Sequence, residues 1–148
     1  MDKKSGLQKA TKRLMDLALS AVSLIVLGAP MCLLAVLIKL ESKGPVLFKQ
    51  ERIGKDGVPF VLYKFRSMRN ETIEGAMFHD AERVTTIGRF IRKWRIDELP
   101  QLFNVLKGDM SVVGPRPTLP YQVERYDESR RRRLQVKPGI TGWSQING

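Results

Sequence analysis

A long apolar run near the N-terminus is the strongest pattern in the sequence. Residues Leu17 to Ile38 form 22 consecutive positions without a charged side chain. At about 1.5 Å of rise per residue, a straight helix of this length just crosses a hydrocarbon core of about 30 Å. A secretory signal would have a shorter apolar region, of about 7–15 residues. The pattern therefore predicts a helix that enters a membrane.

Two features argue against an ordinary spanning helix. Pro30, near the middle of the run, lacks a backbone N–H and its ring clashes with the preceding turn, so the helix should kink or break there. Both flanks are basic, and cytoplasmic flanks of membrane helices favour Lys and Arg. The basic residues are Lys3, Lys4, Lys9, Lys12 and Arg13 before the run, and Lys39, Lys43, Lys49 and Arg52 after it. Both flanks can stay in the cytoplasm only if the segment turns back, which favours a helix–break–helix hairpin in one leaflet; a kinked transmembrane helix is the alternative.

The pattern changes to that of strands after Gly44-Pro45. Residues 46–48 indicate a short strand, residues 55–57 (Lys-Asp-Gly) are a turn signal, and residues 58–66 indicate the returning strand. Alternation places Phe60, Leu62, Lys64 and Arg66 on one face. Lys64 and Arg66 would then point the same way as two cationic side chains, unless they simply form a solvated basic edge.

Helical patterns dominate the rest of the chain, after a polar segment at 69–86 that we expect to be irregular. Helices are predicted at 88–95, at 100–107 and at 120–135, with Gly108 and then Lys137-Pro138-Gly139 as stop signals. Leu99, Leu102, Phe103 and Leu106 would form the apolar stripe of the second helix. The predicted fold is α+β and mostly helical, with a membrane hairpin at 1–43 and a second domain at 44–148 that contains a small β-hairpin.

The charge balance narrows the kinds of partner. The chain has 26 Lys plus Arg against 15 Asp plus Glu, a formal net charge of +11. This excess suits nucleic acid, anionic lipid or polyphosphate substrates. The arginine run at 130–133 fits a lipid headgroup contact, a solvated face or a nucleic-acid patch, in that order beside a membrane segment. Because Cys32 and His79 are the only residues of their types, the sequence excludes an intrachain disulfide and a Cys/His metal site.

Asp97 and Glu98 are the first candidate catalytic residues. They lie at the mouth of the helix that Pro100 opens, where the helix dipole favours a carboxylate over a carboxylic acid. Arg92 and Arg95 would favour the charged form as well. An ionised carboxylate can act as a nucleophile or as a ligand of a hard metal ion. Adjacent acids are also common on protein surfaces, so this pair is informative only with its surroundings.

Arg116 is the second candidate, because it lies between Pro115 and Pro117. Prolines restrict the backbone on both sides, so the guanidinium has little conformational entropy left to lose on binding. Arginine forks match phosphate oxygens with two parallel hydrogen bonds. A rigid loop with an incidental arginine is the alternative. Together these residues predict a site at a membrane surface that contains two carboxylates, several cations and Mg²⁺.

At this point the sequence resembles the monotopic phosphoglycosyl transferases, also called bacterial sugar transferases. The resemblance covers nearly the whole chain. Its segments are Lys12-Arg13 with Asp16, Gly44 to Gln50 with Arg52-Ile53-Gly54, Tyr63 to Met68, Arg83-Val84-Thr85 with Ile87-Gly88-Arg89, Asp97 to Leu102, Asn104 to Ser111, Val113 to Pro117 and Lys137 to Trp143. A collinear series of this kind is far more specific than one short motif.

The resemblance implies a re-entrant membrane helix, interfacial amphipathic helices and a small catalytic domain on the cytoplasmic face of the bacterial inner membrane. It implies transfer of a sugar phosphate from a nucleotide-sugar, usually a UDP-sugar, to polyprenol phosphate, which starts glycan or glycoconjugate assembly. Asp97 matches the nucleophile and Glu98 its partner, and Mg²⁺ is the expected metal, with Asp97 and Glu98 as its candidate ligands. Lys64, Arg66, Arg92 and Arg116 are the candidate phosphate contacts, although Arg66 and Arg92 could instead brace the carboxylates.

Two points remain open at the level of sequence. A non-catalytic membrane-surface binder of nucleotide-sugar or anionic lipid is the competing function, whereas a nucleic-acid binder rests on charge alone. Members of the family usually continue beyond the segment that matches Trp143 to Gly148, so further C-terminal residues could contribute to nucleotide binding. The sequence leaves the oligomeric state open, and a homo-oligomer is compatible with it.

Overall fold

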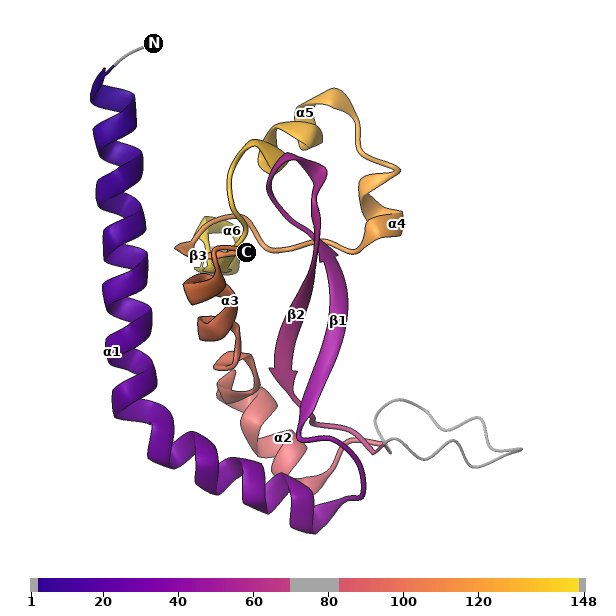
Figure 1. Ribbon diagram of the computed structural model, residues 1–148. Helices are drawn as coiled ribbons and strands as arrows, with labels where there is room; N and C mark the ends of the chain where they lie inside the picture. The colour runs from indigo at the N-terminus through magenta and orange to yellow at the C-terminus, as the bar shows by residue number, and fades with distance from the viewer. Residues whose placement is uncertain (1–2, 70–82, 147–148) are drawn as a thin grey trace.

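The computed structural model describes residues 3–69 and 83–146, and Figure 1 shows their arrangement. His79 and most of the polar segment expected to be irregular lie outside the described residues. The chain is α+β, as expected, with far more residues in helices than in strands. Its long N-terminal helix runs beside a small body built from two short strand pairs and several short helices.

Helix α1 (Lys3–Glu41) is 39 residues long and has Pro30 inside it. Figure 1 shows a sharp bend in α1, more than half-way along its length. The sequence predicted a kink or a break within this run; α1 bends but continues as one helix, and its two arms do not fold back on each other. It is the one helix in the described part of the chain that is long and apolar enough to cross a membrane, and only 11% of its most apolar window is buried.

The predicted β-hairpin is present. Strand β1 (Leu47–Ile53) pairs antiparallel with β2 (Pro59–Phe65), from Leu47 opposite Phe65 to Ile53 opposite Pro59. A 3₁₀ turn, η1 (Lys55–Gly57), connects them, and Asp56 and Gly57 adopt positive φ there. The Lys-Asp-Gly signal marks this turn because Gly, and Asp next, tolerate the left-handed region.

Of the three helices predicted after the β-hairpin, two are present and the third is divided. Helix α2 (Thr86–Lys93) and helix α3 (Gln101–Lys107) lie near their predicted positions, and Gly108 ends α3 with a φ of 98°. The single helix predicted at 120–135 is instead α4 (Pro120–Val123), α5 (Glu128–Arg131) and a 3₁₀ turn η3 (Arg132–Gln135). Asp127 explains the break, because its side chain accepts a hydrogen bond from the Arg130 N–H and caps a new helix.

Strands β3 (Ser111–Val113) and β4 (Gly139–Thr141) form a second pair, which is parallel and was not predicted, and helix α6 (Trp143–Ile146) follows β4. A strand of three residues is too short to show alternation. The residue after β3 lies so close to the segment before β4 that a Cβ on Gly114 would be 2.4 Å from the Lys137 carbonyl oxygen. Glycine is therefore required at that position by space alone.

The hydrophobic core consists of two clusters. The first joins Met31 and Ile38 of α1 to Phe65 of β2 and Ile91 of α2. The second contains Leu62, Val105 and Met110. The buried face of α3 includes Leu102 and Val105, whereas Phe103, which was predicted in the apolar stripe, is exposed. The body of the protein therefore packs on the bent helix through its first cluster and holds β2 against α3 through its second.

Asn104 links α3 to β2 in the second cluster. Its Oδ1 accepts a hydrogen bond from the Tyr63 N–H at 3.1 Å, and its Nδ2 donates to the Val61 carbonyl at 2.7 Å and to Asp109 Oδ2 at 3.3 Å. Asn104 is fully buried. These bonds satisfy backbone groups on the edge of β2 that has no partner strand in the described residues, where unpaired buried groups would be costly.

We expect Asn104→Leu to lower the free energy of unfolding by about 2–4 kcal/mol, because it leaves two buried backbone groups without partners at about 1–3 kcal/mol each. Chemical denaturation of the detergent-solubilised protein measures this loss. Phe103→Leu, at an exposed neighbouring position, should change stability by less than about 0.5 kcal/mol. Equal effects of the two substitutions would contradict the assigned role of Asn104.

Candidate active site

Asp97 and Glu98 lie in a 3₁₀ turn, η2 (Ile96–Glu98), immediately before α3. Arg95, at the start of this turn, has a φ of 54°, a left-handed conformation that non-glycine residues rarely adopt. Such strain costs on the order of 1 kcal/mol and often occurs at functional sites. Leu99 and Pro100 then lead into the first turn of α3, so the two carboxylates are placed by a short and well-defined segment of backbone.

Lys64 contacts both acids, whereas the strand alternation predicted it only as one of two cationic side chains on the same face. Its Nζ lies 2.8 Å from Glu98 Oε1 and 3.9 Å from Asp97 Oδ2. The side chains of both acids are only 13% exposed. Position 64 on β2 therefore supplies the positive charge that holds Asp97 and Glu98 side by side.

Burial raises the pKa of Asp97 above its usual value. The charge of Lys64 lowers this pKa and the charge of Glu98 raises it, and the balance is a net increase. We had expected the helix N-terminus and the nearby arginines to favour the ionised form. The charge of Arg92 does lower this pKa, but the loss of water around the buried carboxyl outweighs it, so the net direction is opposite to the one expected.

Arg116 lies near the same pair of acids. It lies between Pro115 and Pro117, and we call this segment the proline frame. Arg116 Nη2 lies 3.9 Å from Glu98 Oε1, and half of the arginine side chain remains exposed. The frame is held in place by the end of β1, where the Ile53 N–H donates to the Thr118 carbonyl at 3.0 Å. The guanidinium is thus positioned near the carboxylates while keeping donors available to a ligand.

Arg52 is a site residue that we did not predict beyond its contribution to the basic flank. Arg52 donates to the Pro117 carbonyl at 3.2 Å and to Gln50 Oε1 at 2.6 Å. The first of these bonds ties the proline frame to β1. Burial and the nearby charge of Arg116 lower the pKa of Arg52. In the sequence, Arg52 stood out only as part of the Arg52-Ile53-Gly54 segment of the resemblance. No hydrophobic pattern indicated that it would lie near Arg116.

Arg92 and Arg66 occupy different environments. Arg92 is exposed, and its Nε donates to Ser67 Oγ at 2.8 Å. Arg66 is buried, and its guanidinium donates to the carbonyls of Lys43, Ile38 and Ser42 at the C-terminal end of α1. Strand β2 ends at Phe65, and Arg66 lies just beyond it, where it lines the same cleft as Lys64, Arg92 and Asp97. In this structure its hydrogen bonds brace the C-terminal end of α1 rather than the carboxylates.

A basic cleft of about 440 Å³ opens beside Asp97. Its lining includes Phe48, Gln50, Lys64, Arg69, Arg92 and Asp97. A smaller cleft of about 240 Å³ lies on the Glu98 side, between Arg95, Leu99 and Thr141. Asp97 and Glu98 therefore lie between two clefts. The larger cleft is lined by the basic side chains that a phosphorylated ligand requires.

Comparison with known proteins adds the family. The model of the bacterial sugar transferase family matches residues 7–148. The chain belongs to this family. Among curated relatives, it is 50% identical over 138 residues to the sugar transferase EpsL of Bacillus subtilis, which covers 93% of this chain and 68% of that protein.

Two further relatives of the bacterial sugar transferase family carry more specific names. The chain is 54% identical over 142 residues to the UDP-N-acetylgalactosamine-undecaprenyl-phosphate N-acetylgalactosaminephosphotransferase of Aeromonas hydrophila, with 91% of this chain and 33% of that protein covered. It is 44% identical over 150 residues to the UDP-glucose:undecaprenyl-phosphate glucose-1-phosphate transferase of Escherichia coli, with 97% and 32% covered. The chain thus spans about one third of the length of these two relatives.

A metal site in this family member would need ligands beyond the protein. The described residues contain no group of three or more His, Cys, Asp or Glu side chains that could hold a metal ion. Mg²⁺, however, is often bound by one or two carboxylates together with substrate phosphates and water. Asp97 and Glu98 fit that smaller role, because Asp97 lines the basic cleft and Glu98 lies next to it, with both carboxylates in contact with Lys64.

Proposed function

We propose that this chain is a phosphoglycosyl transferase that moves a sugar phosphate from a UDP-sugar to polyprenol phosphate. The observation that carries the proposal is the pair of adjacent, mostly buried carboxylates bridged by Lys64, with Asp97 in the wall of a basic cleft. The named relatives act on UDP-sugars and undecaprenyl phosphate, which supports these substrate classes. A pure binder of anions would gain nothing from two carboxylates in its binding site, since they repel phosphate.

The proposed reaction proceeds in two steps through an aspartyl phosphosugar. An oxygen of the Asp97 carboxylate attacks the phosphorus that carries the sugar, the diphosphate P–O bond breaks, and UMP leaves with the bonding electron pair. An oxygen of polyprenol phosphate then attacks the same phosphorus and displaces the carboxylate. Because the anionic donor and acceptor need not occupy the site together, this route avoids their mutual repulsion and predicts ping-pong kinetics.

Four basic residues have proposed roles around these steps. Lys64, Arg92 and Arg116 would bind phosphate oxygens of the donor, since Lys64 and Arg92 line the cleft beside Asp97 and Arg116 lies beside Glu98. Arg66 would hold the end of α1 in place, as its hydrogen bonds to α1 carbonyls suggest. Because Arg66 also lines the cleft beside Asp97, it remains a candidate phosphate contact as well.

Asp97 and Glu98 would hold Mg²⁺ together with the donor diphosphate. When bound, the ion offsets the charge of the diphosphate and acts as a Lewis acid. Glu98 would be the steadier ligand, because Asp97 must use one carboxylate oxygen as the nucleophile. Lys64, at 2.8 Å from Glu98, keeps the pair in one orientation before the substrate arrives.

We also propose that α1 is re-entrant and that the catalytic domain lies on the cytoplasmic face of the bacterial inner membrane. The bend in α1, the exposed apolar side chains along it and the basic residues at both ends support this topology. The apolar side chains exposed along α1 include Leu19, Val22, Ile25, Val26, Leu33, Val36 and Leu37. This placement would keep the carboxylates near the level of the lipid headgroups, where the acceptor phosphate lies.

Substitution of Pro30 tests the topology. In a protein with Cys32→Ser and a single new cysteine at Ser5 or Lys49, we expect membrane-impermeant thiol reagents to label both positions only from the cytoplasmic side. Pro30→Ala restores a backbone donor and removes the ring clash, so part of the population should become a spanning helix with Ser5→Cys on the opposite side. Periplasmic labelling of Ser5→Cys in the protein that retains Pro30 would contradict a re-entrant helix.

The activity is tested by UMP release from a panel of UDP-sugars, with the detergent-solubilised protein, Mg²⁺ and polyprenol phosphate. We expect one donor to give UMP, and a stoichiometric amount of UMP to appear even without the acceptor. Release that strictly requires the acceptor would contradict the two-step route. Binding of UDP-sugars without any release from the whole panel would instead favour the membrane-surface binder.

The raised pKa of Asp97 predicts the pH dependence of the reaction. The nucleophile must be ionised, so kcat/KM should fall as the pH falls, with its acidic limb at a higher pH than an ordinary aspartate would give. Because the Lys64 charge lowers this pKa, Lys64→Met should move the limb to still higher pH. A limb that does not move in Lys64→Met would show that another group controls the profile.

A further inference from the structure

A second basic cleft, of about 530 Å³, lies between the N-terminal arm of α1 and the segment that leads into β4. We call it the α1 cleft. Its basic lining residues are Lys9, Lys12, Arg13, Lys55 and Lys137. One acid, Asp16, is also in its wall. None of the residues that line the α1 cleft also lines the openings beside Asp97 and Glu98.

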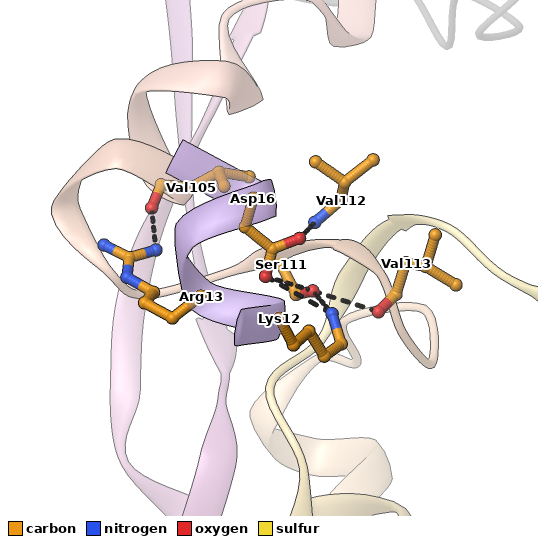
Figure 2. A network of polar contacts seen from close by, with 7 residues as sticks. All are labelled: Lys12, Arg13, Asp16, Val105, Ser111, Val112 and Val113. Carbon is orange, nitrogen blue, oxygen red and sulfur yellow. Dashed lines mark hydrogen bonds and ion pairs between the residues drawn. The ribbon is translucent and has the colours of Figure 1, made fainter. Parts of the chain in front are cut away.

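Two of the five cations have structural partners, as Figure 2 shows. Arg13 donates to the Val105 carbonyl at 2.6 Å and to the Leu106 carbonyl at 3.0 Å, near the end of α3. Lys12 contacts Asp16 at 3.3 Å and donates to Ser111 Oγ. Asp16 is in turn occupied by Ser111 and the Val112 N–H. The single acid of the cleft is therefore already shared among several donors.

The remaining cations are not neutralised within the cleft. Lys9 and Lys137 have no acidic partner within 4.0 Å among the residues that the structure describes, and Lys55 contacts only its exposed neighbour Asp56. Lys137 is half-buried, and burial together with the charges of Arg13 and Lys55 lowers its pKa more than the charges of Asp16 and Asp109 raise it. A Cβ on Gly108 would lie 3.5 Å from both Arg13 Nη2 and Lys137 Nζ, so these two cations approach the same point. Such crowding is relieved by a bound anion.

We propose that the α1 cleft binds the phosphate of an anionic phospholipid headgroup, at a site separate from the candidate active site. A lipid is the favoured source of the phosphate because apolar side chains lie exposed around the cations. Val113 and Val136 are exposed in the wall of the cleft itself, whereas Leu7 and Leu14 are exposed on the opposite face of this arm of α1. Cations that flank a membrane helix attract anionic headgroups, and the neighbouring apolar surface would meet the acyl chains.

Lys137 is the residue that separates this site from general attraction between a basic protein and an anionic membrane. Lys137→Met keeps the length of the side chain and removes one crowded charge, so the lipid-free protein should melt at the same temperature or higher. Its stabilisation by anionic lipid should be lost, because the half-buried cation that would contact the phosphate is gone. Lys49→Ala removes one exposed charge from β1 as the matched control.

The experiment measures the melting temperature of the delipidated, detergent-solubilised full chain. Mixed micelles contain phosphatidylglycerol or phosphatidylcholine, and a third series contains inorganic phosphate in the same detergent. We expect phosphatidylglycerol to raise the melting temperature of wild type and Lys49→Ala, but not of Lys137→Met, with little effect of phosphatidylcholine or free phosphate. Equal shifts with both lipids, an unchanged phosphatidylglycerol shift in Lys137→Met, or an equal shift with inorganic phosphate alone would each overturn the proposal. Since no step uses catalysis, the result is independent of the proposed transferase activity.

Discussion

Asp97→Asn should abolish the release of UMP from the donor sugar, with a loss of about 10⁴-fold or more in kcat. The substitution keeps the size of the side chain but removes the oxygen anion that forms the covalent bond, and losses of this order follow removal of a nucleophile. UMP release in the presence of Mg²⁺ and polyprenol phosphate measures the effect. Glu51→Gln makes the same chemical change at an exposed position of β1 and should leave the rate unchanged.

The same substitution should preserve or increase stability. A carboxyl whose pKa is raised in the folded protein stabilises the fold in its protonated form, and that contribution is lost as the pH rises through the folded pKa. At neutral pH the ionised Asp97 therefore opposes folding, and a neutral asparagine removes this opposition. A melting temperature at or above that of wild type, together with lost activity, would show a catalytic role. Lost activity with a large fall in melting temperature would instead indicate a structural one.

Asp16→Ala should produce the largest loss of stability, about 3 kcal/mol or more. Asp16 accepts hydrogen bonds from Ser111 Oγ at 2.8 Å and from the Val112 N–H at 3.0 Å, and it pairs with Lys12 at 3.3 Å (Figure 2). Its removal leaves a backbone donor and part of a cation unpaired at the joint between α1 and β3. Chemical denaturation and hydrogen exchange of the Val112 N–H measure the loss.

Two further substitutions, one conservative and one at the surface, serve as controls for this prediction. Asp16→Asn keeps one oxygen that can accept from the Val112 N–H, so it should be less damaging than alanine. Glu124→Ala removes an exposed acid beyond α4 and should change stability by less than about 0.5 kcal/mol. If Asp16→Ala were as mild as Glu124→Ala, the contacts of Asp16 would not be what joins the N-terminal arm of α1 to the body.

Local patterns predicted the elements that local physics determines. The β-hairpin followed from alternation and a Lys-Asp-Gly turn, and α3 followed from Pro100 before it and Gly108 after it. The bend in α1 followed from a proline in an apolar run. In contrast, the break at Asp127 could not be predicted, because Asp127 could lie within one continuous helix or cap the start of a new one. Both alternatives were compatible with the sequence, since Asp is acceptable within a helix and better at its start.

The candidate site was predictable only as a set of residue types. Lys64, Asp97 and Arg116 were identified one by one, and the structure brings all three to Glu98. The brace that Arg52 forms with Pro117 spans 65 positions and leaves no periodic signal. The pKa of Asp97 was misjudged for a related reason, because burial is a property of the packed structure and not of the segment that carries the residue.

The central claim is that Asp97 carries the phosphosugar, and it is tested most directly by isolating that species. The detergent-solubilised protein is mixed with Mg²⁺ and the UDP-sugar donor without polyprenol phosphate, quenched in acid, digested and examined by mass spectrometry. We predict that the peptide containing Asp97 gains the mass of one sugar phosphate, that polyprenol phosphate removes this mass, and that Asp97→Asn never gains it. A donor that is turned over while the peptide stays unmodified, or a modification on a different residue, would contradict the account.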